Sequence, residues 1–118
     1  ATVTQERIDL ASKFVDLILP RLVTQHADAI STNLDGLRLM LNRTDDPRIR
    51  ADLEASANKL EKFLQVDTQE ALHKIMVEGF SKEFTVKELK ELIRQEEMNI
   101  RVQAVASSME AAIEKLLQ

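Results

Sequence analysis

The chain has 118 residues and a net charge of -4, which fits one domain and argues against general nucleic-acid binding, where a basic stripe is expected. It has no cysteine, so disulfides, thiol catalysis and cysteine metal sites are excluded, while cytoplasm and periplasm both remain open. Aromatic residues are only 3%, and there are two Gly and two Pro, so the core is aliphatic and turn signals are few. This composition predicts an all-α antiparallel helical bundle, with residues 1–118 as a single domain.

The first part of the chain carries two helical patterns separated by a proline. Apolar residues between positions 8 and 22 recur at the spacing of one helix face and predict a helix over about residues 4–19. Pro20 is expected to break or kink this helix. Beyond it, apolar residues recur alternately at four and three positions and predict a second helix over about residues 20–41.

The middle of the chain predicts a third and a fourth helix. Asp46 can cap the third, and Pro47 suits its first position. The run Asp67-Thr68-Gln69-Glu70 resembles a capping box with acidic residues near the positive end of the helix dipole. The fourth helix is expected to direct four apolar residues inward: Leu72, Ile75, Met76 and Phe80.

The start of the last helix has the clearest local signal. The Thr85 hydroxyl can cap the helix, and Glu88, three residues on, can accept a hydrogen bond from the Thr85 amide. Phe84 and Leu89 occupy the two positions of a hydrophobic staple. A fifth helix is therefore predicted over about residues 86–117.

This last helix is too long for a compact domain and has two apolar faces. At 1.5 Å per residue it would span about 48 Å, whereas a domain of this size has a radius of gyration of about 13 Å. Either the helix bends near residues 94–99, or its distal half packs on a second copy. Because that stretch has no Pro or Gly to cause a bend, a continuous helix and a homodimer are favoured. The distal face is the expected partner-binding surface: Met98, Val102, Val105, Met109, Ala112 and Leu116.

The stretch from about residue 72 to 93, with the motif Phe84-Thr85-x-x-Glu88-Leu89, resembles a family of small bacterial envelope proteins. The resemblance covers about a fifth of the chain. It implies an all-helical periplasmic domain without an assigned activity and without established catalytic residues. The family continues with an aromatic pair and a Ser-Pro-x-Gly turn, and this chain lacks both.

No motif indicates catalysis, a cofactor or a metal. His26 and His73, the two histidines, have no metal-ligand spacing around them. Glu96 and Glu97 are adjacent acids, but a ferritin-like site needs Glu-x-x-His on two helices, and the chain has none. The sequence therefore predicts a protein that is not an enzyme and has no catalytic, cofactor-binding or metal residues.

The predicted function is a non-catalytic protein-interaction module of the bacterial envelope, with a protein partner or a second copy bound on the distal face. The alternative is a carrier of a small apolar ligand held between helices. No apolar run reaches the length of a membrane span. The periplasm is the expected compartment, with the cytoplasm open. Ala1 is either a signal-peptidase product or a trimmed end.

Overall fold

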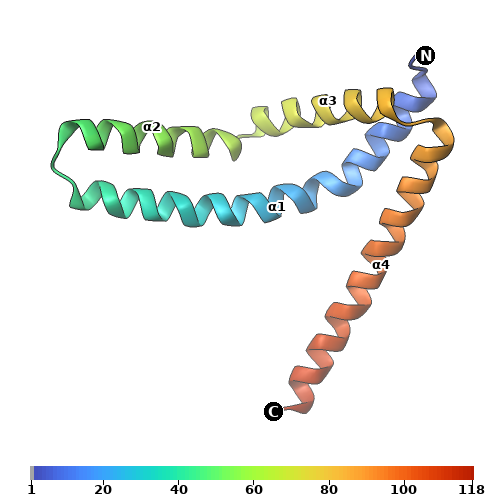
Figure 1. Cartoon of the computed structure of the whole chain (residues 1–118). Helices are drawn as coiled ribbons and strands as arrows, with labels where there is room; N and C mark the ends of the chain where they lie inside the picture. Colours follow the sequence, from blue (N-terminus) through green and yellow to red (C-terminus); the bar gives the residue numbers. More distant parts are fainter. Residues whose placement is uncertain (1) are drawn as a thin grey trace. The chain divides into compact units, whose positions relative to one another are not determined.

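The computed structural model describes residues 2–118, so Ala1 and the prediction about its origin lie outside the described residues. This part of the chain is helical without strands, and it forms four helices. They are α1 (Gln5–Arg43), α2 (Pro47–Phe63), α3 (Val66–Glu83) and α4 (Val86–Leu116), shown in Figure 1. The all-α prediction and the long last helix are confirmed, whereas the prediction of five helices is wrong.

The boundary predicted between the first two helices at Pro20 is absent, because this proline lies inside the continuous helix α1. A proline removes one amide donor, and an interior proline costs a helix about 3 kcal/mol. Burial on both sides offsets that cost, because Val15 and Ile18 are buried before the proline and Leu34 is buried after it. Four residues on, the Thr24 hydroxyl donates a 2.8 Å hydrogen bond to the Pro20 carbonyl oxygen.

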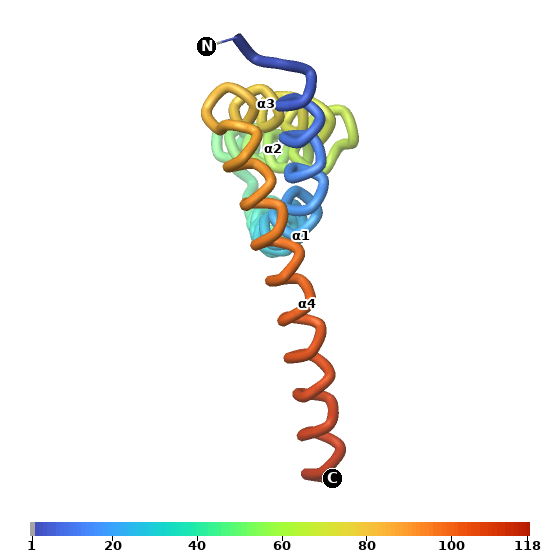
Figure 2. Tube along the Cα trace, turned by 90° about the vertical axis from the view of Figure 1, so that its right-hand side faces the viewer, coloured from blue at the N-terminus to red at the C-terminus, as the bar shows by residue number. Residues whose placement is uncertain are grey.

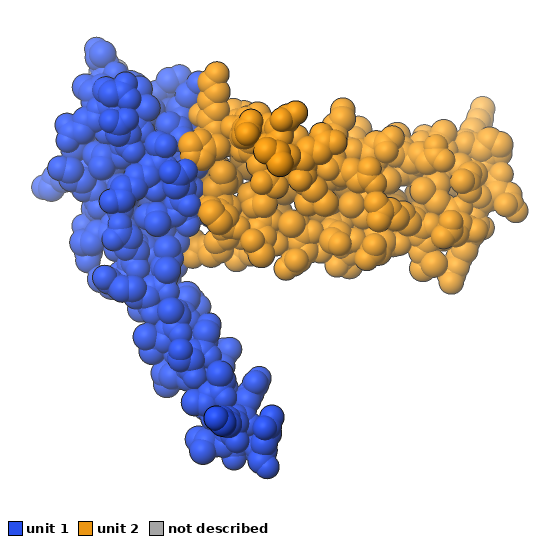
Figure 3. Space-filling model, turned by 180° about the vertical axis from the view of Figure 1, so that it is seen from behind, with its two compact units in different colours: residues 1–18, 77–118 blue, residues 19–76 orange. Residues whose placement is uncertain are grey.

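The chain divides into two compact units, coloured separately in Figure 3. Unit 1 holds the residues up to 18 together with 77–118, and unit 2 holds 19–76. Helices α1 and α3 each contribute to both units, whereas α2 lies wholly in unit 2 and α4 wholly in unit 1. The single domain over residues 1–118 stays a prediction.

In unit 2, α2 runs antiparallel to residues 19–43 of α1 (Figure 1). The Asp46 side chain accepts from the Arg48 amide at 2.9 Å, and Pro47 opens the helix, which confirms the predicted cap. Arg38 and Glu61 form an ion pair at 2.8 Å between α1 and α2. The apolar face predicted over residues 20–41 points inward. Leu34 is buried, and the other residues of this face are half-buried: Val23, Ala27, Ile30, Leu37 and Leu41.

The start and the inward face of α3 differ from the prediction. Helix α3 begins at Val66, so Asp67 lies in its first turn instead of capping it. The preceding turn is tight, since the Gln65 amide donates to the Lys62 carbonyl oxygen and the Gln69 amide already donates to the Gln65 carbonyl oxygen. Of the four residues expected inside, three are half-buried, but Ile75 is exposed and that prediction is wrong.

Unit 1 has a small aliphatic core supplemented by phenylalanines. Ala11 and Val15 of α1 are fully buried, as is Leu89 of α4. The Phe80 ring meets Phe14 edge-on, with the ring centroids 5.1 Å apart, and stacks on Phe84 at 5.6 Å. These contacts join the first part of α1 to the end of α3 and the start of α4.

Candidate functional site

The start of α4 has the predicted capping-box geometry. The Glu88 amide donates to the Thr85 hydroxyl oxygen at 3.2 Å, and the Thr85 amide donates to Glu88 Oε1 at 3.0 Å. The bond from the Thr85 backbone holds the pKa of the Glu88 carboxyl below its ordinary value, with smaller contributions from the Thr85 hydroxyl and the Arg7 charge. The cap therefore fixes the first turn of α4.

Arg7, near the start of α1, stabilises the same turn through hydrogen bonds. Its guanidinium donates to the carbonyl oxygen of Phe84 at 3.0 Å and to that of Lys82 at 2.9 Å. The planar fork of arginine suits two acceptors at once, and the two carbonyls belong to the end of α3 and the turn after it. Sequence reasoning missed Arg7, because nothing local relates it to residues 75 and 77 positions away.

The proximal half of α4, residues 86–97, packs against the rest of unit 1. Leu89 and Ile93 are 0% and 6% exposed. At the outer side of this half, Arg94 donates two hydrogen bonds to the carboxylate of Glu91, at 2.9 and 2.6 Å. That pairing lowers the pKa of Glu91 and raises that of Arg94. Near the end of this packed region, Lys13 of α1 lies 3.9 Å from Glu97.

The distal half of α4, residues 98–116, continues as one helix beyond the other described segments of unit 1 (Figure 2). Its predicted partner-binding residues are all exposed, and the five large ones range from 44% at Met98 to 85% at Leu116. They recur at steps of 4, 3, 4, 3 and 4 residues, so they form one stripe along the helix. We call this stripe the α4 seam: Met98, Val102, Val105, Met109, Ala112 and Leu116.

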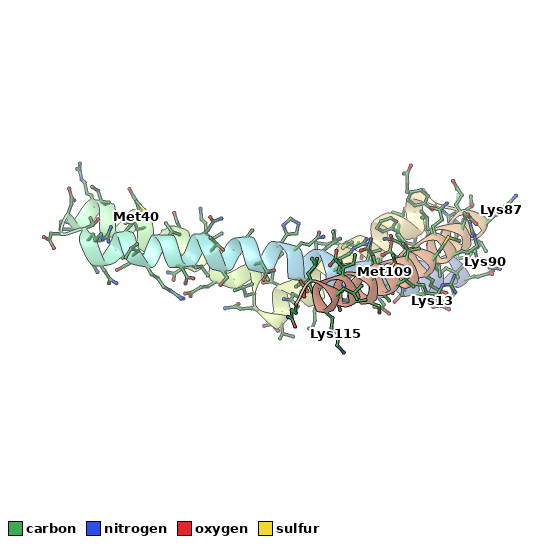
Figure 4. The ribbon with its side chains drawn as sticks, turned by 90° about the horizontal axis from the view of Figure 1, so that it is seen from below. Lys13, Met40, Lys87, Lys90, Met109 and Lys115 are labelled. Atoms are coloured by element: carbon green, nitrogen blue, oxygen red, sulfur yellow. The ribbon has the colours of Figure 1, made fainter. Side chains whose placement is uncertain are left out.

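Two open hollows follow the α4 seam. One, of about 380 Å³, is lined by Arg101 and Ala106 together with four seam residues, Met98, Val102, Val105 and Met109. The other lies further along, at Ala104, Ser108 and Ala112. Figure 4 marks Met109 on this part of the helix and Lys115 near its end. The surface is apolar in its middle and carries a cation at its edge.

The two histidines lie on different helices and are engaged differently. The His26 ring of α1 meets the Phe63 ring edge-on, with centroids 6.1 Å apart. His73 lines an open hollow of about 310 Å³ beside Leu19 and Glu70 in unit 2. Among residues 2–118, no group of three or more His, Asp or Glu side chains is placed to hold a metal ion.

The arginines around the α1–α2 turn are partly used within unit 2. Arg38 pairs with Glu61. Arg50 donates to the carbonyl oxygens of Leu41 and Thr44, at 2.6 and 3.1 Å, and lies 3.9 Å from Glu54. Arg50 therefore stabilises the turn, and Arg38 links α1 to α2.

Comparison with known proteins places no further constraint on the site. No family model matches this chain, and neither a curated protein nor a solved structure matches it. The resemblance of residues 72–93 to the envelope family stays a prediction. In the described part of the chain, no helix is both long and apolar enough to cross a membrane. The α4 seam is the candidate site that the geometry supports best.

Proposed function

We propose that this protein is a non-catalytic interaction module and that the α4 seam is its docking surface for another α-helix. The observation that carries the proposal is the contrast within one helix. The apolar residues of α4 are buried or half-buried up to Ile93, whereas the large apolar residues from Met98 onward are exposed. An isolated amphipathic helix packs most readily by placing its apolar stripe against a second such stripe. Soluble proteins seldom leave a contiguous apolar surface of this kind uncovered.

The alternative of a carrier for a small apolar ligand has less support. A carrier encloses most of its ligand in a cavity between helices. The hollows along the α4 seam are open to solvent and lie on one helix, and the hollow beside His73 is also open. An open stripe of methionine, valine and leucine suits a helix better than a small molecule, because methionine side chains repack easily around a partner.

We also propose that this interaction module works in the bacterial envelope, with the periplasm as its compartment. This part of the proposal rests on the resemblance of the motif Phe84-Thr85-x-x-Glu88-Leu89 to the envelope family. A protein without cysteine can work there without disulfide bonds.

Site-specific photo-crosslinking of the full chain tests the docking surface. A benzophenone amino acid replaces Val105 in the seam or, as the matched control, Ser107 on the opposite side of the helix. In an extract of the source cells, we expect adducts from position 105 that map by peptide mass spectrometry to one face of an amphipathic helix. Adding Val102→Glu to the probe protein should abolish them. Equal labelling from both positions, or none from position 105, contradicts the proposal.

A further inference from the structure

We infer that the partner helix on the α4 seam is the same helix of a second copy, aligned parallel and in register as a short two-stranded coiled coil. This inference rests on the proposed function and names its partner. The six seam residues occupy alternating steps of four and three, which are the core positions of three consecutive heptads. In a parallel pair in register, each seam residue packs against the same residue of the second copy, so every pair of residues across the interface is apolar.

The residues beside the seam distinguish the two possible orientations. Arg101 and Lys115 each directly precede a seam residue and so line one edge of the stripe. Asn99, Ala106 and Ile113 each directly follow one and line the other edge, which carries no charge. An antiparallel pair would place Arg101 of each copy opposite Lys115 of the other, so two contacts between like charges would form. A parallel pair places each cation opposite an uncharged edge, so like charges do not meet.

The size of the surface is sufficient for a weak dimer. Covering the seam on two copies would bury roughly 1,200 Å², which lies at the lower limit for stable specific interfaces. Small residues on and beside the seam, including Ala106 and Ala112, allow the two backbones to approach closely. We therefore expect association with a dissociation constant in the micromolar range.

Disulfide trapping tests the orientation directly, because the natural chain has no cysteine. Three single-cysteine variants of the full chain are compared under a glutathione redox buffer at about 100 µM protein: Met98→Cys, Leu116→Cys and the control Ser107→Cys. A disulfide needs Cα atoms within about 7 Å. In the parallel pair, we expect Met98→Cys and Leu116→Cys each to form covalent dimers at least tenfold more readily than the control.

Two outcomes would overturn the inference. Covalent dimers that form only when Met98→Cys and Leu116→Cys are mixed would show an antiparallel pair. Cross-linking no better than that of Ser107→Cys, with the wild-type sedimenting as a monomer at the same concentration, would show that a second copy is not the partner. Seam-specific photo-adducts to another protein would then leave the proposed docking function standing, so the two claims fail separately. A variant without an added cysteine gives a second test. In sedimentation equilibrium, we expect the dissociation constant of Val105→Glu to be more than tenfold higher than that of the wild type, with most of the helix content retained.

Discussion

The two halves of α4 belong to one helix and both carry apolar residues, but they have different surroundings. Leu89 and Ile93 lie inside unit 1, whereas Val105 and Met109 are each 59% exposed. The helix start is fastened by the Thr85 cap and by Arg7, and the distal half has no equivalent tertiary contact among the described residues of unit 1. In proteins, most of the stability of a helix comes from the packing of its apolar face against other parts of the structure. The proximal half therefore stabilises the fold, whereas the apolar stripe of the distal half lies exposed.

The largest expected effect is the difference between equivalent truncations in the two halves. Leu89→Ala removes a fully buried side chain and should lower the free energy of unfolding by about 2–5 kcal/mol. Val105→Ala in dilute protein should change it by about 0.5 kcal/mol or less, as at ordinary exposed positions. Urea denaturation followed by circular dichroism measures both. Similar losses for the two variants would mean that the distal half packs within its own chain.

The next effect concerns the link between α1 and the start of α4. Arg7→Ala leaves the carbonyl oxygens of Lys82 and Phe84 without their charged donor, and we expect a loss of about 1–2 kcal/mol in the free energy of unfolding. Arg7→Lys is the matched control, because it keeps the charge but lacks the planar fork. The lysine variant should recover less than half of the loss. Full recovery would show that the charge alone matters.

A smaller effect is expected at the cap. Thr85→Ala removes the hydroxyl that accepts from the Glu88 amide and should cost about 1 kcal/mol in urea melts. Thr85→Ser keeps that oxygen and should be nearly neutral. If alanine were as stable as serine at this position, the cap would not contribute to the proximal half.

The smallest effect is a pH dependence from the same cap. The Thr85 backbone and hydroxyl hold the pKa of Glu88 below its ordinary value of 4.5. A carboxyl with a depressed pKa in the folded state contributes stability that is present above the unfolded pKa and is lost as the pH falls through the folded pKa. The free energy of unfolding should therefore decline below about pH 4.5, and Glu88→Gln should flatten part of that decline. An identical pH profile in the two proteins would remove Glu88 as a source of the dependence.

The parts of the fold that were predictable are those fixed by residues within one helical turn. Thr85 with Glu88, and Asp46 with Pro47, need only their own neighbours to form caps, and both caps are present. The helix end predicted at Pro20 is wrong, because local propensity favours a helix end at a proline, whereas α1 continues through it with packed residues on both sides. The hydrogen bonds from Arg7 to Lys82 and Phe84 were not predictable, because they join residues more than 70 positions apart. The spacing of the α4 seam was visible in the sequence, but its exposure depends on how much of α4 the rest of unit 1 covers.

Hydrogen exchange along α4, measured at several protein concentrations, tests the central claim most directly. Exchange of an amide reports the local opening of the helix that contains it. The account predicts that amides near Leu89 and Ile93 exchange slowly at every concentration. Amides near Val105 and Met109 should exchange quickly in dilute protein and become protected as the concentration rises through the micromolar range. Protection in the distal half that is strong in dilute protein and independent of concentration would contradict the account.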